Sequence, residues 1–180
     1  GLGDVYKRQD QASAFATLFT GSNPCFSGIA GDKTFDFEKE KEVSILNDPE
    51  YLGNYTKENY SPKNLFSSTI GDELKIASQG RSDVYSIAPD AESAILSAGH
   101  AANGAFWMDN TNGKWATTTY YKGIPWYVDR YNNGPESLAS RLETMVWTPT
   151  LPMEKYNGNQ QKCSCYWRQQ SDHDVCFRIR

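Results

Sequence analysis

The chain is organised around residues 83–100, Asp83-Val-Tyr-Ser-Ile-Ala-Pro-Asp-Ala-Glu-Ser-Ala-Ile-Leu-Ser-Ala-Gly-His100. This stretch opens with a short β-prone run that ends at Pro89, because proline cannot donate a hydrogen bond to a strand ladder. A polar turn at 90–92 then leads into a short helical segment at 93–98. Many α/β proteins bind ligands where a strand ends and a helix begins. The sequence therefore predicts that the loop at 89–92 faces the functional site.

Two helices are predicted before this stretch. Residues 11–20 are apolar and rich in alanine, which favours a buried helix that packs closely on a sheet. Ser61 and Pro62 suit the start of an amphipathic helix that runs to Gly80, with apolar residues at helical spacing. A helix that feeds a strand is typical of a parallel α/β unit.

The rest of the chain adds an insertion and a hairpin. Residues 34–60 are charged, aromatic and irregular, which predicts a surface insertion with one short strand at 43–46. Two β-prone runs at 104–108 and 114–121 flank an Asn- and Gly-rich turn and predict a β-hairpin. Short helices are expected at 125–131 and 136–145. The expected fold is α/β, with a mainly parallel sheet flanked by helices, a β-hairpin and an irregular insertion.

Composition limits the classes of function. The 180 residues can build one domain with its own core, and 38% hydrophobic with 22% charged residues is typical of a globular protein. The net charge is −4 and no cluster of Lys and Arg is visible, which argues against a nucleic-acid polymer as partner. No apolar run approaches the length of a membrane span. Residues 1–9 show neither periodicity nor a targeting pattern, and we expect them to be extraneous to the fold.

The C-terminal residues 158–180 are left unassigned. Cys163, Cys165 and Cys176 lie there beside His173, but their spacing matches no common zinc finger. A tail that takes no part in the fold is the simpler interpretation, and a zinc site is the alternative.

The many aromatic residues also allow two interpretations. The chain has 11 Tyr, 8 Phe and 5 Trp, and such side chains can line a sugar or nucleotide site or simply fill a core. A rim open to a ligand would have to be exposed in one groove. The candidate residues for it are Phe106, Trp107, Trp115, Tyr120, Tyr121, Trp126 and Tyr127.

Several stretches between residues 10 and 157 resemble, in their order and spacing, the alkaline phosphatase superfamily. The nearest match is its type I phosphodiesterase/nucleotide pyrophosphatase branch. The stretches are 20–32 (TGSNPCFSGIAGD), 61–65, 69–74, 93–100 (SAILSAGH), 106–109, 119–121, 125–129 and, weakly, 151–156. The resemblance implies that residues 10–157 form an incomplete alkaline-phosphatase-like domain. It also implies a periplasmic or secreted protein that acts on a small-molecule phosphoester.

The same resemblance implies a particular chemistry. In the family a threonine attacks phosphorus, and two zinc ions stabilise the attacking and leaving oxygens. An asparagine contacts a phosphoryl oxygen, and some monoesterases add a lysine and an arginine. Counted without gaps, the nucleophile position falls on Gln11, the asparagine position on Asp32, and the lysine and arginine positions on Asp90 and Glu92.

These substitutions allow three interpretations: a degenerate phosphoester site, a plain surface turn at 89–92, or a diesterase. Gln11 cannot form a phosphoryl-enzyme intermediate, whereas the hydroxyls of Ser13 and Thr17 would require a shift of register. Asp90 and Glu92 would repel a phosphate monoester, although 89–92 could also be a plain surface turn in a repurposed relative. Loss of the lysine and arginine alone would suit a diesterase, whose substrate carries less charge.

Metal ligands are scarce in this chain. It has only two histidines, His100 and His173, and we expect His100 to be a loop residue that bonds the backbone. The chain therefore cannot assemble a two-metal site of its own, and two zinc ions are expected only in a full-length parent enzyme. The leading hypothesis is a fragment of a zinc-dependent phosphoester hydrolase, not competent for catalysis by itself and with an open sheet edge. The alternative is a degenerate, non-catalytic relative that binds a sugar or nucleotide through the aromatic rim.

Overall fold

The computed structural model describes residues 10–37, 40–138 and 140–141, which belong to two compact units. The first unit consists of Gly1–Asp109 and Trp115–Pro125, and the second of Asn110–Lys114 and Trp126–Arg180. The predictions for 1–9 and 158–180, including the cysteine-rich tail, fall outside the described residues, as does most of the helix expected at 136–145. Within the described ranges no helix is long and apolar enough to cross a membrane.

A four-stranded mixed sheet lies at the centre of the first unit. Its strands follow the order β3-β6-β5-β4, with β4 parallel to β5 and the other two pairs antiparallel. The α/β prediction is confirmed. The sheet was expected to be mainly parallel, but the described strands form a mixed sheet because the predicted hairpin contributes two of them. The strands are β3 Gly53–Asn54, β4 Tyr85–Ala88, β5 Gly104–Met108 and β6 Trp115–Thr118.

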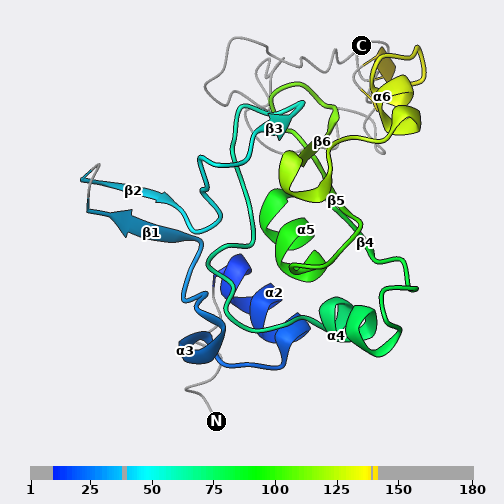
Figure 1. Cartoon of the computed structure of the whole chain (residues 1–180). Coiled ribbons are helices and arrows are strands. Elements are labelled where there is room, and N and C mark those ends of the chain that lie inside the picture. Colours follow the sequence, from blue (N-terminus) through cyan, green and yellow to red (C-terminus); the bar gives the residue numbers. More distant parts are fainter. Residues whose placement is uncertain (1–9, 38–39, 139, 142–180) are drawn as a thin grey trace, which may run out of the picture. The chain divides into compact units, whose positions relative to one another are not determined.

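Two helices stack on one another over this sheet. Helix α5, Ala91–Ala98, packs on β4 and β5, and helix α2, Gln11–Thr20, packs on α5 (Figure 1). Small residues make this close approach possible: Ala12, Ala16 and Ala94 are fully buried. The predicted helix at 11–20 is thus confirmed, although it packs on another helix and not directly on the sheet.

Helix α4, Ile70–Ala77, begins eight residues later than the predicted start at Pro62. Thr69 and Asp72 form a reciprocal capping box, in which each side chain accepts a hydrogen bond from the other residue's backbone N–H. Ser61, the predicted cap, accepts a hydrogen bond from the N–H of Lys63 at 3.2 Å and donates to the buried carboxylate of Asp48 at 2.6 Å, but only a turn at 63–64 follows it. The predicted start was wrong because the capping box at Thr69 and Asp72 begins the helix.

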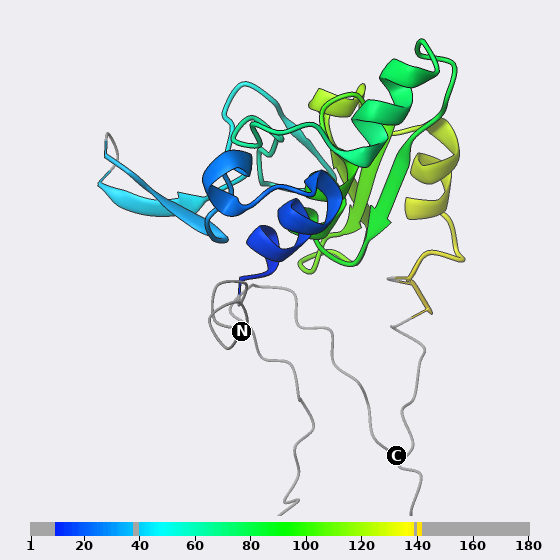
Figure 2. The same cartoon turned by 90° about the horizontal axis from the view of Figure 1, so that it is seen from below.

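The insertion is more ordered than its composition suggests. Strands β1, Lys33–Asp36, and β2, Lys41–Ser44, form an antiparallel hairpin. This hairpin extends away from the rest of its unit in both views (Figures 1 and 2). The strand predicted at 43–46 therefore lies two residues too late, since Ile45 and Leu46 turn into the core with 7% and 1% exposure.

The C-terminal part of the first unit follows the predicted hairpin until Thr118. Residues Thr119–Tyr121 then form a short 3-10 helix, η1, where the sequence predicted more strand. The hydroxyl of Tyr121 donates to the carbonyl of Gly99 at 2.7 Å, so this turn is tied to the end of α5. In the second unit, helix α6, Trp126–Asn132, confirms the short aromatic helix predicted there.

Candidate functional site

The start of helix α2 is capped by a residue from a following loop. Asp10 stands at the N-cap position but makes no side-chain cap bond. Asp32 does so instead, accepting a hydrogen bond from the N–H of Ala12 at 2.7 Å. Asp32 reaches this place through a tight loop that begins at Gly28, where φ is 81°. Asp32 therefore uses one oxygen to satisfy a helix N–H group that would otherwise need water or a ligand.

Gln11, the first residue of α2, links that helix to α5. Its side-chain amide donates to the hydroxyl of Ser93 at 2.7 Å. The same hydroxyl donates to the carboxylate of Asp90 at 3.0 Å, and the N–H of Ser93 donates to that carboxylate at 2.9 Å. Asp90 is thus the N-cap of α5, which argues against the alternative of a plain surface turn at 89–92.

Burial and charge perturb Glu92, in the first turn of α5. Burial raises the pKa of Glu92, and the nearby carboxylates of Asp90, Asp32 and Glu58 raise it further. The structure thus brings the four predicted site positions together. We call Gln11, Asp32, Asp90, Glu92 and Ser93 the helix-start cluster, because all of them lie at or cap the first turns of α2 and α5.

Two residues from the insertion complete the surroundings of Glu92. Burial raises the pKa of the Tyr60 phenol, and a hydrogen bond with the Glu58 carboxylate and the charge of Glu92 add to the effect. No motif in 34–60 predicts that Glu58 and Tyr60 lie near Glu92. For Ser93 a signal did exist, because Asp followed three residues later by Ser suits an N-cap and its bonded N3 position.

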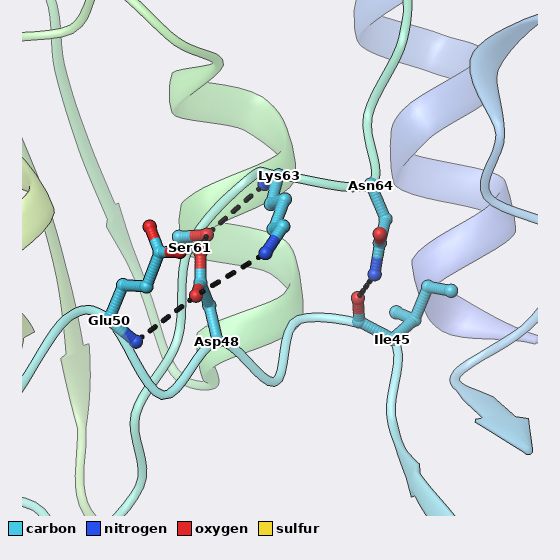
Figure 3. Close-up of polar contacts among 6 residues, drawn as sticks. All are labelled: Ile45, Asp48, Glu50, Ser61, Lys63 and Asn64. Carbon is cyan, nitrogen blue, oxygen red and sulfur yellow. Dashed lines mark hydrogen bonds and ion pairs between the residues drawn. The ribbon is translucent and has the colours of Figure 1, made fainter. Parts of the chain in front are cut away.

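The segment 58–64, which carries Glu58 and Tyr60, is attached to the loop at 45–48 mainly through Asp48 (Figure 3). The Asp48 carboxylate is buried and accepts hydrogen bonds from the Ser61 hydroxyl at 2.6 Å and the Glu50 N–H at 3.2 Å. The ammonium of Lys63 lies 3.9 Å from the same carboxylate. In addition, the N–H of Asp48 donates to the carbonyl of Asn59, and the side-chain amide of Asn64 donates to the carbonyl of Ile45 at 2.6 Å. These bonds hold the segment 58–64 against residues 45–48.

The alternative nucleophiles are buried. The side chain of Ser13 is 1% exposed, and its hydroxyl makes no hydrogen bond within the described residues. The hydroxyl of Thr17 is likewise buried and unbonded among those residues. A shift of register would therefore place a hydroxyl inside the protein and not at the helix-start cluster.

The described residues do not fit a two-zinc centre. No three His, Cys, Asp or Glu side chains among them lie close enough together to hold a metal ion. His100, the one histidine in the described part of the chain, has its Nε2 2.8 Å from the carbonyl of Leu65. This contact confirms the expectation that His100 bonds the backbone.

The aromatic residues do not form an open rim. Phe106, Trp107 and Tyr121 are 5%, 3% and 2% exposed, so they belong to the interior of the first unit. Trp126 and Tyr127 are exposed, but they lie in the second unit. A ligand groove lined by all of these side chains therefore finds no support.

The chain is similar to known alkaline phosphatases along most of its length. It is 36% identical over 155 residues to alkaline phosphatase PafA of Elizabethkingia meningoseptica, covering 83% of this chain and 28% of PafA. It is 32% identical over 161 residues to alkaline phosphatase PhoV of Synechococcus elongatus, covering 87% of this chain and 29% of PhoV. No family model matches the sequence.

Solved structures agree with these relatives. The crystal structure of wild-type PafA superimposes with a TM-score of 0.71 at 35% identity, over 82% of this chain and 29% of that one. A PafA variant in which one threonine, one asparagine, one lysine and one arginine are replaced gives a TM-score of 0.70. The chain spans less than a third of the length of the proteins it matches. With sequence and fold in agreement, this chain belongs to the alkaline phosphatase superfamily.

Proposed function

We propose that this chain is part of a phosphoester hydrolase domain whose phosphoryl site has been replaced by a self-bonded acidic cluster. As it stands, the chain does not catalyse phosphoryl transfer. The observation that carries this proposal is the hydrogen bond from the Gln11 amide to the Ser93 hydroxyl. Gln11 stands at the expected nucleophile position, and its side chain is engaged in this bond. A carboxamide cannot take the role of an attacking hydroxyl.

The spacing of the four positions supports the assignment. In the substituted PafA variant the threonine and asparagine lie 21 positions apart, as do Gln11 and Asp32. The lysine and arginine of that variant lie two positions apart, as do Asp90 and Glu92. The order along the chain is also the same. The interval between the two pairs is 62 positions in the variant and 58 in this chain, so the assignment rests on the order and on the two intervals within the pairs.

Charge at the cluster acts against a phosphate ligand. A transferring phosphoryl group needs fixed donors and cations around its oxygens. Asp32, Asp90 and Glu92 place carboxylates there, and no ion pair among the described residues neutralises them. Two of the helix N–H groups that could bind an anion, those of Ala12 and Ser93, already donate to Asp32 and Asp90. Together these features replace attractive charge by repulsion and occupy two of the donors.

The remaining expectations rest on the family alone. A longer protein that includes this chain would supply the ligands of two zinc ions from other segments. We also retain the type I phosphodiesterase branch and a periplasmic or secreted location as expectations for that protein. A small-molecule phosphoester remains the substrate class of the family, and the helix-start cluster is the part of the site that this chain contributes.

Hydrolysis and phosphate binding provide the test. The purified chain is incubated with p-nitrophenyl phosphate or bis(p-nitrophenyl) phosphate and Zn²⁺, with PafA as the positive control. No hydrolysis above the blank is expected, and mass spectrometry should find no phosphate on Ser13 or Thr17. Zinc-dependent turnover by the purified chain, or a phosphorylated hydroxyl, would refute the proposal.

A charge reversal tests the binding argument separately. Asp90→Lys with Glu92→Arg should allow inorganic phosphate to shift the amide NMR signals of Ala12 and Ser93, whereas the unmodified chain should show no shift. The matched control is Glu73→Lys with Glu42→Arg, which makes the same change of net charge at exposed positions elsewhere in the first unit. Equal shifts in the reversal and control variants would show that net charge alone, and not the cluster, governs binding.

A further inference from the structure

Asparagine is followed directly by glycine at three places in the described part of the chain, 103–104, 112–113 and 133–134. A fourth such pair, at 157–158, lies outside the described residues. Because glycine has no Cβ, its backbone nitrogen can approach the carbonyl carbon of the preceding asparagine side chain. Asparagine is among the thermally labile residues of proteins. The hydrogen bonds of the fold, which differ among the three described pairs, determine whether this approach is possible.

The pair at 103–104 is held at both residues. The Asn103 side chain accepts a hydrogen bond from the Val84 N–H at 3.0 Å and donates one to the Asp83 carboxylate at 2.9 Å. The backbone N–H of Asn103 donates to the Val84 carbonyl at 2.8 Å. Gly104 is buried and begins β5, which pairs with β4. The Asn103 side chain therefore cannot turn toward the Gly104 nitrogen unless two side-chain hydrogen bonds break.

The pair at 133–134, which follows helix α6, is also engaged. The Asn133 amide donates to the Asp129 carbonyl at 3.1 Å, and its Oδ1 accepts from the Lys114 ammonium at 3.3 Å. The N–H of Gly134 donates to the Tyr131 carbonyl at 3.1 Å. That bond would have to break as well, because the glycine nitrogen attacks only after it has lost this proton.

The pair at 112–113 lies in the turn between β5 and β6. Asn112 is exposed, and Gly113 has a φ of 64°, a left-handed conformation that glycine adopts freely. The Asn112 Oδ1 accepts a hydrogen bond from the Lys114 N–H at 2.8 Å. This bond spans Gly113, so it holds the side-chain carbonyl near the Gly113 nitrogen. The same N–H would stabilise the negative charge that develops on Oδ1 when the carbonyl carbon is attacked.

We propose that Asn112 is a site of spontaneous covalent modification, at which its amide is converted to aspartate or isoaspartate through a cyclic imide with Gly113. The deprotonated Gly113 nitrogen bonds to the Asn112 Cγ, the Cγ–Nδ2 bond breaks, and Nδ2 takes up a proton and leaves as ammonia. Water then opens the imide at either carbonyl, which yields the two products. This inference does not depend on the chemistry proposed for the helix-start cluster.

Both products alter the turn. Each adds a negative charge to a chain whose net charge is already −4. Isoaspartate also leads the main chain through the former side chain and so lengthens the turn by one carbon atom. The neighbouring register pair of β5 and β6, Met108 with Trp115, would experience this change first.

Peptide mapping tests the proposal. The purified 180-residue chain is kept at neutral pH and sampled over several weeks, and mass spectrometry with electron-transfer fragmentation distinguishes asparagine, aspartate and isoaspartate. Asn112 should convert at least about tenfold faster than Asn103 or Asn133, because each of those pairs must first lose two hydrogen bonds. In urea that unfolds the chain, the three pairs should convert at similar rates, since they share the same dipeptide.

The matched control is Asn112→Gln, which keeps the amide and the net charge. Its longer side chain must close a larger ring that forms more slowly, so conversion at 112 should fall at least about tenfold while the rates at 103 and 133 stay the same. Conversion of Asn103 or Asn133 as fast as that of Asn112 in the folded chain would overturn the proposal. Equal conversion of the glutamine variant at 112, or the same order of rates in urea as in the folded chain, would overturn it as well.

Discussion

Replacing Asp72 should destabilise the first unit more than replacing any exposed carboxylate, and should change its acid sensitivity. Asp72 is 4% exposed and accepts three backbone hydrogen bonds, from Thr69 at 2.9 Å, His100 at 2.9 Å and Ala101 at 2.7 Å. A hydrogen bond to a charged group contributes about 1.5–3 kcal/mol. For Asp72→Ala we expect a loss of about 3 kcal/mol in the free energy of unfolding, less than the sum because water can reach the N–H groups of His100 and Ala101.

The sign of the pH effect follows from the same bonds. Burial alone would raise the pKa of Asp72, but the backbone N–H groups of Thr69, Ala101 and His100 outweigh it and lower the pKa below the ordinary value of 3.8. A carboxyl group with a lowered native pKa stabilises the fold above its unfolded pKa. That contribution disappears as the pH falls through the native pKa, so the effect lies below about pH 4.

Urea unfolding followed by circular dichroism, at pH 7 and at steps down to about pH 3, measures both effects. Asp72→Asn should lose about 1–2 kcal/mol at pH 7 and should then lose less stability than the unmodified chain on acidification. Glu73→Gln is the matched control, because Glu73 is the next residue of the same helix and is exposed. If Asp72→Asn and the unmodified chain lost stability in parallel below pH 4, the proposed role of the Asp72 carboxylate would be wrong.

Three further predictions use the same assay. A carboxyl group with a raised native pKa opposes folding when it is ionised, so the unmodified chain should gain stability from Glu92 on acidification. Glu92→Gln should therefore stabilise the chain at pH 7 and abolish that gain. A destabilised variant would contradict this. Tyr121→Phe should cost about 1 kcal/mol through loss of the bond to Gly99, and an unchanged urea midpoint would count against that bond. Ser13→Ala should stabilise the chain by about 0.5–1 kcal/mol, because it removes a buried hydroxyl without a described partner and favours helix, whereas a loss would reveal a partner.

Local patterns were sufficient to predict the elements whose ends depend on neighbouring residues. The alanine-rich run gave α2, the β-prone run before Pro89 gave β4, and the Asn- and Gly-rich turn gave the β5–β6 hairpin. The start of α4 was missed because Ser61 caps only a single turn, whereas the capping box of Thr69 and Asp72 begins the helix. The β1–β2 hairpin was missed because half of its strand residues are charged and most are exposed, so no alternation of apolar residues marks the strands.

The candidate site was only partly visible in the sequence. Spacing within the family resemblance placed Gln11, Asp32, Asp90 and Glu92 at corresponding positions, and the structure brings these positions together. Their hydrogen-bond partners could not be predicted, since the Gln11–Ser93 bond joins residues 82 positions apart. Contacts across such separations depend on how α2 packs on α5, which periodicity does not specify.

The bond between Gln11 and Ser93 also bears on how this segment can evolve. Sites that bind charged ligands keep donors unfilled and like charges close together, and this usually lowers folding stability. Here the Gln11 amide and the Asp32 carboxylate instead join one helix start to its neighbours. Each such bond contributes about 1 kcal/mol. A threonine in place of Gln11 would therefore lose the bond to Ser93, whereas an asparagine in place of Asp32 would keep an acceptor for the Ala12 N–H, so stability constrains the two positions differently.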